Sequence, residues 1–258
     1  MVPGILPVDI DGFVCLLLLL GPLLFLQRRL HREIQAVFLL LTHRSDISIV
    51  LFSIVFLPGV LLHESSHFLM AKTLSVRTGR FSILPKPIDN GRLQLGFVET
   101  GRADLVRDSL IGMAPVISGS LFLIYVGLVQ LNLGTIWENI HLSSNLPALW
   151  KSLAILPGLP DFWLWFYLAF VVSSTMLPSA SDRRAWLPLG LSLGLLLAIS
   201  LFAGAGPWLA DHVAPVLNEG LSAFSIVLGI SAFVHLVLVL PVGIIRIALS
   251  RLTGYQVV

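Results

Sequence analysis

Three ionisable side chains lie close together in an otherwise apolar stretch of the chain, at His63, Glu64 and His67. On a helix, residues four apart share one face, so both imidazoles can reach a single metal ion. Imidazole ligands with an open coordination position suit Zn²⁺, which lowers the pKa of a bound water to about 7. Glu64 can take a proton from that water as it attacks a peptide carbonyl, and then pass the proton to the leaving amine. The spacing therefore predicts a zinc peptidase site.

A less specialised explanation of the same residues stays open. An ionisable group in an apolar run is costly unless it is paired. Two histidines and a glutamate could hydrogen-bond to neighbouring helices as a structural cluster, or form part of a metal or proton pathway. A pathway would need polar residues through several spans, and the other apolar runs offer little except His235 and scattered Ser and Thr. A metal site is the favoured interpretation.

A catalytic zinc usually has three protein ligands, so the two histidines need a partner. Asp182 is the favoured candidate, because it follows the fourth predicted span on the same side as the end of the second, and Pro178 frees the backbone there for a turn. Asp182 could instead be a capping carboxylate paired with a neighbouring arginine. Glu99 and His235 are the other candidates, although His235 is expected to be a buried histidine bonded to a backbone carbonyl. The remaining histidines are expected to be solvated: His31, His43, His141 and His212.

The rest of the chain has the composition of a membrane protein. Of its 258 residues, 56% are hydrophobic and 12% are charged, whereas about a quarter are charged in an average soluble domain. Many apolar runs approach the roughly 20 residues that one transmembrane helix needs. The one cysteine, Cys15, lies in such a run and excludes an intrachain disulfide or a cysteine metal cluster. We expect an all-α polytopic membrane protein with about six transmembrane helices, at residues 10–26, 47–73, 110–131, 162–177, 185–203 and 221–245.

Between the second and third predicted spans the apolar pattern changes to period two. Asn-Gly between alternating apolar residues is a strong hairpin signal, and the chain has Asp-Asn-Gly at 89–91. The alternating apolar residues on either side are Phe81, Ile83, Leu93, Leu95 and Phe97. The sequence therefore predicts a small membrane-associated β-hairpin after the zinc-binding helix.

Basic residues follow the second and fourth predicted spans and end the chain, whereas residues 132–161 contain one lysine and residues 206–219 contain no Lys or Arg. The positive-inside rule then places the hairpin, the Asp182 loop and the C-terminus on the cytoplasmic side of the cell membrane. Arginines at 28, 29, 32 and 44 conflict with this orientation if the first run is a full span. Residues 27–44 could lie along the surface, or the first run could be re-entrant.

At three places the chain resembles the site-2 proteases, a family of zinc intramembrane metalloproteases. Residues 58–67 read PGVLLHESSH, like the family's zinc-binding helix, and residues 112–119 read GMAPVISG, like the small-residue stretch of its next span. Residues 174–182 read STMLPSASD, similar to the Asn-Pro and Leu-Asp-Gly motif that carries the third ligand. The resemblance covers roughly residues 47–186. It implies that His63, His67 and Asp182 bind one zinc ion per chain and that Glu64 is the catalytic base.

The chain also departs from the family's pattern. Ser174 or Thr175 stands where the family has asparagine, and Pro178 is one residue closer to the aspartate. Asp182 is followed by Arg183, where the family has glycine. These differences leave open a catalytically inactive scaffold that binds client helices. A metal or proton transporter ranks last.

These features divide the chain into an N-terminal span with a basic connection (1–46), a metalloprotease core (47–186) and two C-terminal spans with a short tail (187–258). The expected partners are the lipid bilayer and a transmembrane protein or peptide substrate. The basic residues lie mostly at span ends, so we expect no nucleic-acid partner. An unwound substrate could add to a strand edge at 79–84 or 92–98, unless the hairpin only caps the bundle. The candidate substrate-binding residues are Leu93, Leu95, Phe97 and Pro115.

Overall fold

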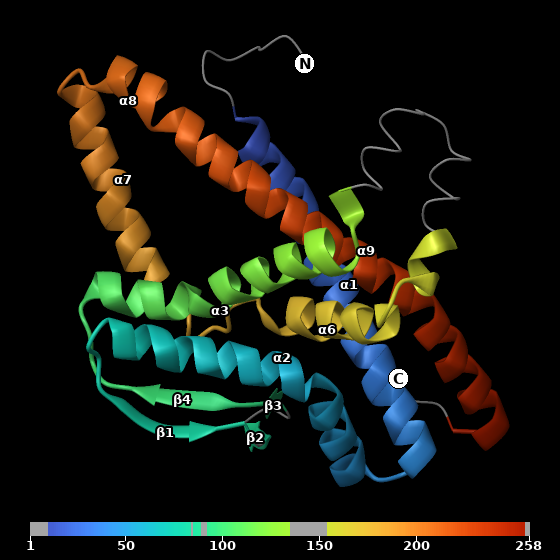
Figure 1. The fold of residues 1–258 in the computed structure, drawn as a ribbon. Helices are drawn as coiled ribbons and strands as arrows, with labels where there is room; N and C mark the ends of the chain where they lie inside the picture. Colours follow the sequence, from blue (N-terminus) through green and yellow to red (C-terminus); the bar gives the residue numbers. More distant parts are fainter. Residues whose placement is uncertain (1–9, 84, 89–91, 135–153, 256–258) are drawn as a thin grey trace.

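The computed structural model describes residues 10–83, 85–88, 92–134 and 154–255. It is mostly helical, with a small β-ribbon beside one helix (Figure 1). The helices are α1 (Asp11–Thr42), α2 (Ser45–Thr73), α3 (Leu105–Tyr125) with a π-helical continuation η2 (Val126–Gln130), the 3-10 turn η3 (Leu156–Gly158), α6 (Phe162–Thr175), α7 (Trp186–Phe202), α8 (Gly206–His212) and α9 (Ala214–Thr253). The strands are β1 (Thr78–Ser82), β2 (Lys86–Ile88), β3 (Arg92–Gln94) and β4 (Phe97–Thr100).

Four helices of the described ranges are long and apolar enough to cross a bilayer, namely α1, α2, α3 with η2, and α9. The pair α7 and α8 would make a fifth span, although the two helices are bent by 120°. The expectation of a mostly helical chain with several helices that could span a membrane is thus confirmed, and the expectation of six spans is not. The predicted fourth span is α6, which has 14 residues. At roughly 1.5 Å per residue it reaches about 21 Å, against a hydrocarbon thickness of about 30 Å.

Two long helices from opposite ends of the sequence, α1 and α9, run parallel to each other and pair along much of their length (Figure 1). Near the start of α1 the amide of Gly12 donates to Asn218 Oδ1 over 2.8 Å. Farther along, Arg246 donates to the buried carboxylate of Glu33, which also pairs with Arg29 at 2.7 Å. Because Glu33 has these partners, the charged stretch stays helical. Residues 27–42 continue the same helix as the first apolar run, since α1 is unbroken to Thr42.

A two-residue turn after α1 reverses the chain into α2, and His43 in this turn has a left-handed φ of 53°. The ring of His43 lies 5.0 Å from that of Tyr255, just beyond the end of α9. The C-terminal end of α9 therefore lies beside the start of α2, whereas the hairpin follows the other end of α2. If α2 crosses the bilayer, these two ends face opposite sides, which differs from the common cytoplasmic side expected for the C-terminus and the hairpin.

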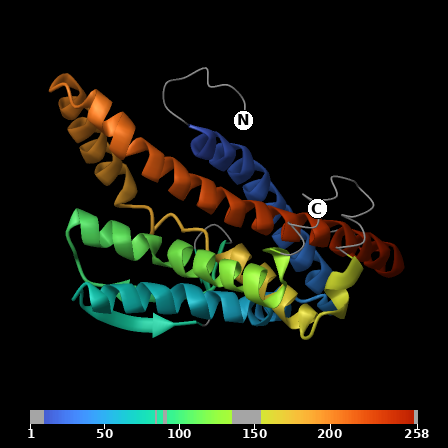
Figure 2. The same cartoon turned by 45° about the horizontal axis from the view of Figure 1, so that its top comes forward.

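Three helices form the part of the bundle that carries the candidate site. Figure 2 shows α2 and α3 side by side, with the α1–α9 pair crossing over them. The third helix, α6, lies directly on α2, because a Cβ at Gly59 would overlap the carbonyl oxygen of Val171 and come within 2.5 Å of Thr175 Oγ1. The apolar core between these helices includes Phe56, Val60 and Phe170. The glycine thus permits the end of α6 to approach the histidine-bearing turn of α2.

The predicted β-hairpin is confirmed. Its outer part pairs β1 with β4, from Thr78 opposite Thr100 to Ser82 opposite Phe97. Its inner part pairs β2 with β3, and the Asp-Asn-Gly turn at 89–91 lies outside the described residues. The ribbon runs back along α2, and Gly96 is buried against that helix (Figure 1).

Candidate metal centre

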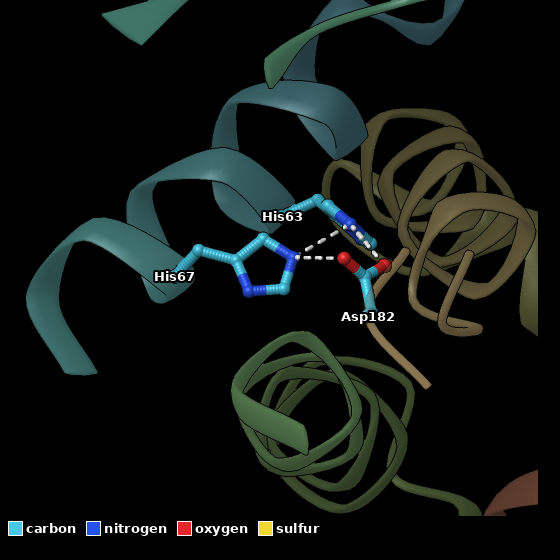
Figure 3. A group of neighbouring side chains, drawn as sticks. All are labelled: His63, His67 and Asp182. Atoms are coloured by element: carbon cyan, nitrogen blue, oxygen red, sulfur yellow. Dashed lines mark hydrogen bonds and ion pairs between the residues drawn. The ribbon is translucent and has the colours of Figure 1, made fainter. Parts of the chain in front are cut away.

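The two histidines of α2 and the aspartate after α6 point toward one another (Figure 3). The Nε2 atoms of His63 and His67 are 3.2 Å apart. Asp182 Oδ2 lies 3.7 Å from His63 Nε2, and Asp182 Oδ1 lies 3.4 Å from His67 Nε2. Two ligands on a tetrahedral zinc, each about 2.0 Å from the ion, are about 3.3 Å apart. The three side chains can therefore share one metal ion of zinc's size.

Hydrogen bonds at the far nitrogens fix the orientation of both rings. His63 Nδ1 lies 2.7 Å from the carbonyl oxygen of Thr175, at the end of α6. His67 Nδ1 lies 2.8 Å from the carbonyl oxygen of Ile111, in α3. A carbonyl oxygen only accepts, so each Nδ1 carries a hydrogen and each neutral ring presents a lone pair at Nε2. Backbone carbonyls of this kind are the usual outer partners of metal-bound histidines.

The candidate metal centre therefore brings three hydrogen-bond acceptors close together. Two ring nitrogens with lone pairs and one carboxylate converge within 4.8 Å of one another. Acceptors packed this closely repel one another unless a cation lies between them. A proton on one Nε2 satisfies part of the cluster, whereas a divalent ion satisfies all three ligands at once. The donor set, two imidazoles and a carboxylate, suits zinc.

Asp182 is held by its own loop as well as by the histidines. The amide of Ser179 donates to Asp182 Oδ2 over 2.7 Å. Burial raises the pKa of Asp182, and hydrogen bonds from the two histidines and Ser179 outweigh that effect, so the pKa lies well below its usual range. These bonds from the histidines require a hydrogen on each Nε2 atom. A metal ion at the site would take the place of that hydrogen. A cation bound beside the carboxylate would likewise favour its ionised form.

The Asp182 loop reaches the histidines because α3 lets its backbone come close. A Cβ at Gly112 would overlap the carbonyl oxygen of Asp182. One turn before Gly112, Asp108 accepts two bonds from Arg184 Nη2, at 3.0 and 3.2 Å, and one from Nε at 3.2 Å. The small-residue stretch predicted on the third span thus contacts the aspartate-bearing loop. Farther along, a Cβ at Gly119 would lie 2.6 Å from Met176 Cβ.

Glu64 lies at the same cavity as the three candidate ligands. The cavity has a volume of about 500 Å³ and is walled by α1, α2, the hairpin, α3 and the Asp182 loop. Glu64 is buried, and the hairpin passes directly over it: a Cβ at Gly96 would lie 2.8 Å from Glu64 Cγ and 3.0 Å from Glu64 Oε1. The predicted base and the predicted ligands therefore line one cavity.

The predicted substrate-binding residues divide into three groups. Leu95 and Phe97, on either side of Gly96, line the cavity. Pro115 is buried inside α3 and is not among the residues that line it. The side chain of Leu93 lies outside the described part of the structure.

The other candidate ligands lie elsewhere. Glu99 accepts from Arg80 Nε at 3.0 Å on the exposed face of the hairpin. His235 is fully buried and its Nδ1 lies 2.7 Å from the Ser231 carbonyl oxygen, as expected for a structural histidine. The expectation that His31 is solvated is wrong, because α1 stays helical there and His31 lines the cavity. His141 falls outside the described residues.

Sequence reasoning also missed Ser174 as a cavity residue. Ser174 stands out in the sequence only as a replacement for the family's asparagine, and its hydrogen-bond partner His235 lies far away in the chain. The local signal at Ser174 is a polar residue inside an apolar stretch, whereas His31 lies in a charged stretch that gives no such signal.

No protein-family model, curated protein or solved structure matches this chain.

Proposed function

We propose that this chain is a zinc-dependent intramembrane endopeptidase of the site-2 protease type, which hydrolyses peptide bonds of membrane-embedded substrates. The observation that supports it best is the convergence of His63 Nε2, His67 Nε2 and the Asp182 carboxylate beside Glu64 at one cavity. The set has three protein ligands, as in most catalytic zinc sites, and α2 is long and apolar enough to span a bilayer.

Each residue has a defined role in this proposal. Zinc held by His63, His67 and Asp182 would polarise a peptide carbonyl and lower the pKa of a water at its open position to about 7. Glu64 accepts a proton from the attacking water and donates it to the leaving amine. The carbonyls of Thr175 and Ile111 keep both imidazoles in the tautomer that binds metal.

The hairpin gives the proposed substrate a place to lie. A peptide bond inside a helix is shielded, so the substrate must be locally extended when it is cut. Leu95 and Phe97 line the cavity on the hairpin side, with the backbone of Gly96 between them. We propose that the extended segment lies along residues 95–98, where the backbone can offer hydrogen bonds and the apolar side chains can contact substrate side chains.

Comparison of the parent with Glu64→Gln tests this function. Both full-length proteins are purified in detergent, loaded with zinc and mixed with a panel of single-span model substrates. We expect equal zinc content and a cleavage rate lower by at least about 100-fold in the variant, since it loses the general base. Glu99→Gln, which changes an acidic residue outside the cavity, should cleave like the parent.

Two results would contradict the proposal. Equal cleavage by the parent and Glu64→Gln would assign the activity to something other than this site. Substrates that bind both proteins and remain intact in both would favour the non-catalytic scaffold.

A further inference from the structure

The cavity has a polar end formed by two residues that are neither proposed metal ligands nor the proposed base. His31 comes from α1 and Ser174 from the last turn of α6, and both line the cavity. The two helices meet here, because Gln27, about one turn before His31, donates from Nε2 to the Ser174 carbonyl oxygen over 2.5 Å. Val60 and Leu95 also line it, and the rings of Phe52 and Phe56 pack edge-on against the His31 ring, with centroids 5.6 and 4.9 Å away. Two hydrogen-bonding side chains thus lie among apolar ones, which is the usual composition of a ligand site.

The hydrogen-bonding character of Ser174 is fixed by the residue behind it. His235 Nδ1 lies 2.7 Å from the Ser231 carbonyl oxygen, so this nitrogen carries the hydrogen. His235 Nε2 is then an acceptor, and it lies 2.9 Å from Ser174 Oγ. The Ser174 hydroxyl therefore donates its one hydrogen to His235. Only the lone pairs of Ser174 Oγ remain available to a ligand in the cavity.

His31 offers a nitrogen that has no protein partner. His31 Nε2 is buried and makes no hydrogen bond to any residue that the structure describes. A buried polar atom without a partner costs about 1–3 kcal/mol, so a turn of the His31 ring that brings this nitrogen to a bound group gains affinity. A charged group would have to be desolvated among apolar side chains, which disfavours it relative to a neutral one.

The polar end adjoins the metal centre directly. Ser174 precedes Thr175, whose carbonyl oxygen orients His63. Val60 lies less than one helical turn before His63 on α2 and lines the cavity beside it. A ligand that reaches the metal along this wall of the cavity can therefore place a neighbouring group at His31 and Ser174.

We propose that His31 and Ser174 form a specificity subsite that binds a neutral, hydrogen-bonding side chain of the bound segment, such as that of Asn, Gln, Ser or Thr. The inference rests on the proposed peptidase function and names the substrate feature that the same cavity selects. A carboxamide fits best, because its NH₂ group can donate to Ser174 Oγ while its oxygen or second hydrogen meets His31 Nε2.

Binding of uncleavable peptides tests the subsite without relying on catalysis. The probes are short peptide hydroxamates, whose hydroxamate group binds zinc, each carrying either Asn or the similarly sized Leu at one of several successive positions. Zinc-loaded full-length protein in detergent is titrated with each pair. At one position we expect Asn to bind about ten-fold more tightly than Leu, the effect of one well-placed buried hydrogen bond.

Variants then assign the preference to the two residues. His31→Phe should bring the Asn to Leu ratio down to about one or reverse it, and Ser174→Ala should lower it as well. His31→Gln keeps a neutral hydrogen-bonding side chain and should retain part of the preference. His212→Phe makes the same change at an exposed histidine stacked on Trp208, and should behave like the parent. Zinc content is measured for every protein, and should not change.

Three outcomes would overturn the subsite. The parent could prefer Leu or show no preference at every position, the Asn preference could survive both His31→Phe and Ser174→Ala, or no hydroxamate could bind the zinc-loaded protein. A selective Asn preference in a protein that cleaves no peptide would refute the peptidase function and leave the subsite standing. Cleavage without any Asn preference would do the reverse.

Discussion

At the level of single residues, the candidate metal centre depends on which nitrogen of each ring carries a hydrogen. The carbonyl oxygens of Thr175 and Ile111 accept hydrogen bonds from Nδ1 of His63 and His67. Both Nε2 atoms therefore keep a lone pair, and the two atoms lie 3.2 Å apart. The Asp182 carboxylate completes the set at 3.4 and 3.7 Å. Three helical or loop segments thus cooperate to fix two rings that lie on a single helical turn.

The third ligand can be tested by replacing its charge with a neutral side chain of the same shape. Asp182→Asn should weaken zinc binding by at least the roughly 100-fold that loss of an outer-shell partner can cause, because a metal ligand is lost outright. Glu99→Gln, at the alternative acidic residue, should bind zinc like the parent. Competition with a chromophoric chelator measures both affinities. Equal affinity of the Asp182→Asn protein and the parent would exclude Asp182 as a ligand.

The spacing of His63, Glu64 and His67 was enough to predict that they share one face, because helical geometry is local. Asp182 could be proposed from its position after an apolar run and from motif resemblance. His31 and Ser174 could not be predicted, because nothing in their local sequence separates a cavity residue from a solvated or packed one. Their contacts join segments that are far apart in the chain, such as Ser174 with His235.

At the level of elements, the Asp182 loop is positioned by a close approach to α3. Gly112 leaves room for the Asp182 carbonyl, and the Asp108–Arg184 pair fastens the same loop on the outer side. The loop must lie here for its carboxylate to meet the histidines of α2. Small shifts of α3 should therefore change metal affinity without touching a ligand.

Gly112→Ala tests this dependence. The added Cβ overlaps the Asp182 carbonyl oxygen, so the loop must move and zinc affinity should fall by about ten-fold or more. Gly190→Ala is the matched control, because a Cβ there meets nothing within 4 Å on α7. Chelator competition measures the affinity, and the helical circular dichroism signal should be the same in both variants. An unchanged affinity in Gly112→Ala would show that the loop is not held by this approach.

The hairpin was predictable because alternation and an Asn-Gly turn are local signals. The extents of α1 and α6 were not. α1 continues through its charged stretch because Arg246 of α9 neutralises Glu33, a contact between the two ends of the chain. α6 is short, yet residues 169–174 are all buried, so packing against its neighbours stabilises it in place of a full bilayer crossing.

At the level of the whole molecule, the pairing of α1 with α9 decides where the chain's ends lie. These helices have 32 and 40 residues, longer than the roughly 20 that a bilayer needs, so they must tilt or extend beyond it. Arg44, Arg246 and Arg251 gather near the α1–α2 turn, whereas the hairpin carries basic residues beyond the other end of α2. Both ends of the bundle are therefore basic, which explains why the positive-inside rule left a conflict.

This arrangement predicts that the hairpin and the C-terminal end of α9 lie on opposite sides of the membrane. Single cysteines replace Arg80 in β1 or Arg251 in α9, both exposed, in a Cys15→Ala background. A membrane-impermeant maleimide added to sealed vesicles of one orientation should label one of the two proteins and not the other. Labelling of both from the same side would contradict the placement of α2 as a full crossing between them.

The measurement that tests the account most directly is the metal content of the purified chain. Full-length protein in detergent is incubated with zinc, freed of excess ion and analysed by mass spectrometry of the elements, beside the double variant His63→Ala, His67→Ala. We predict one zinc ion per parent chain and none on the variant. A parent that takes up no zinc, or a variant that still holds one ion per chain, would contradict a metal centre at these residues.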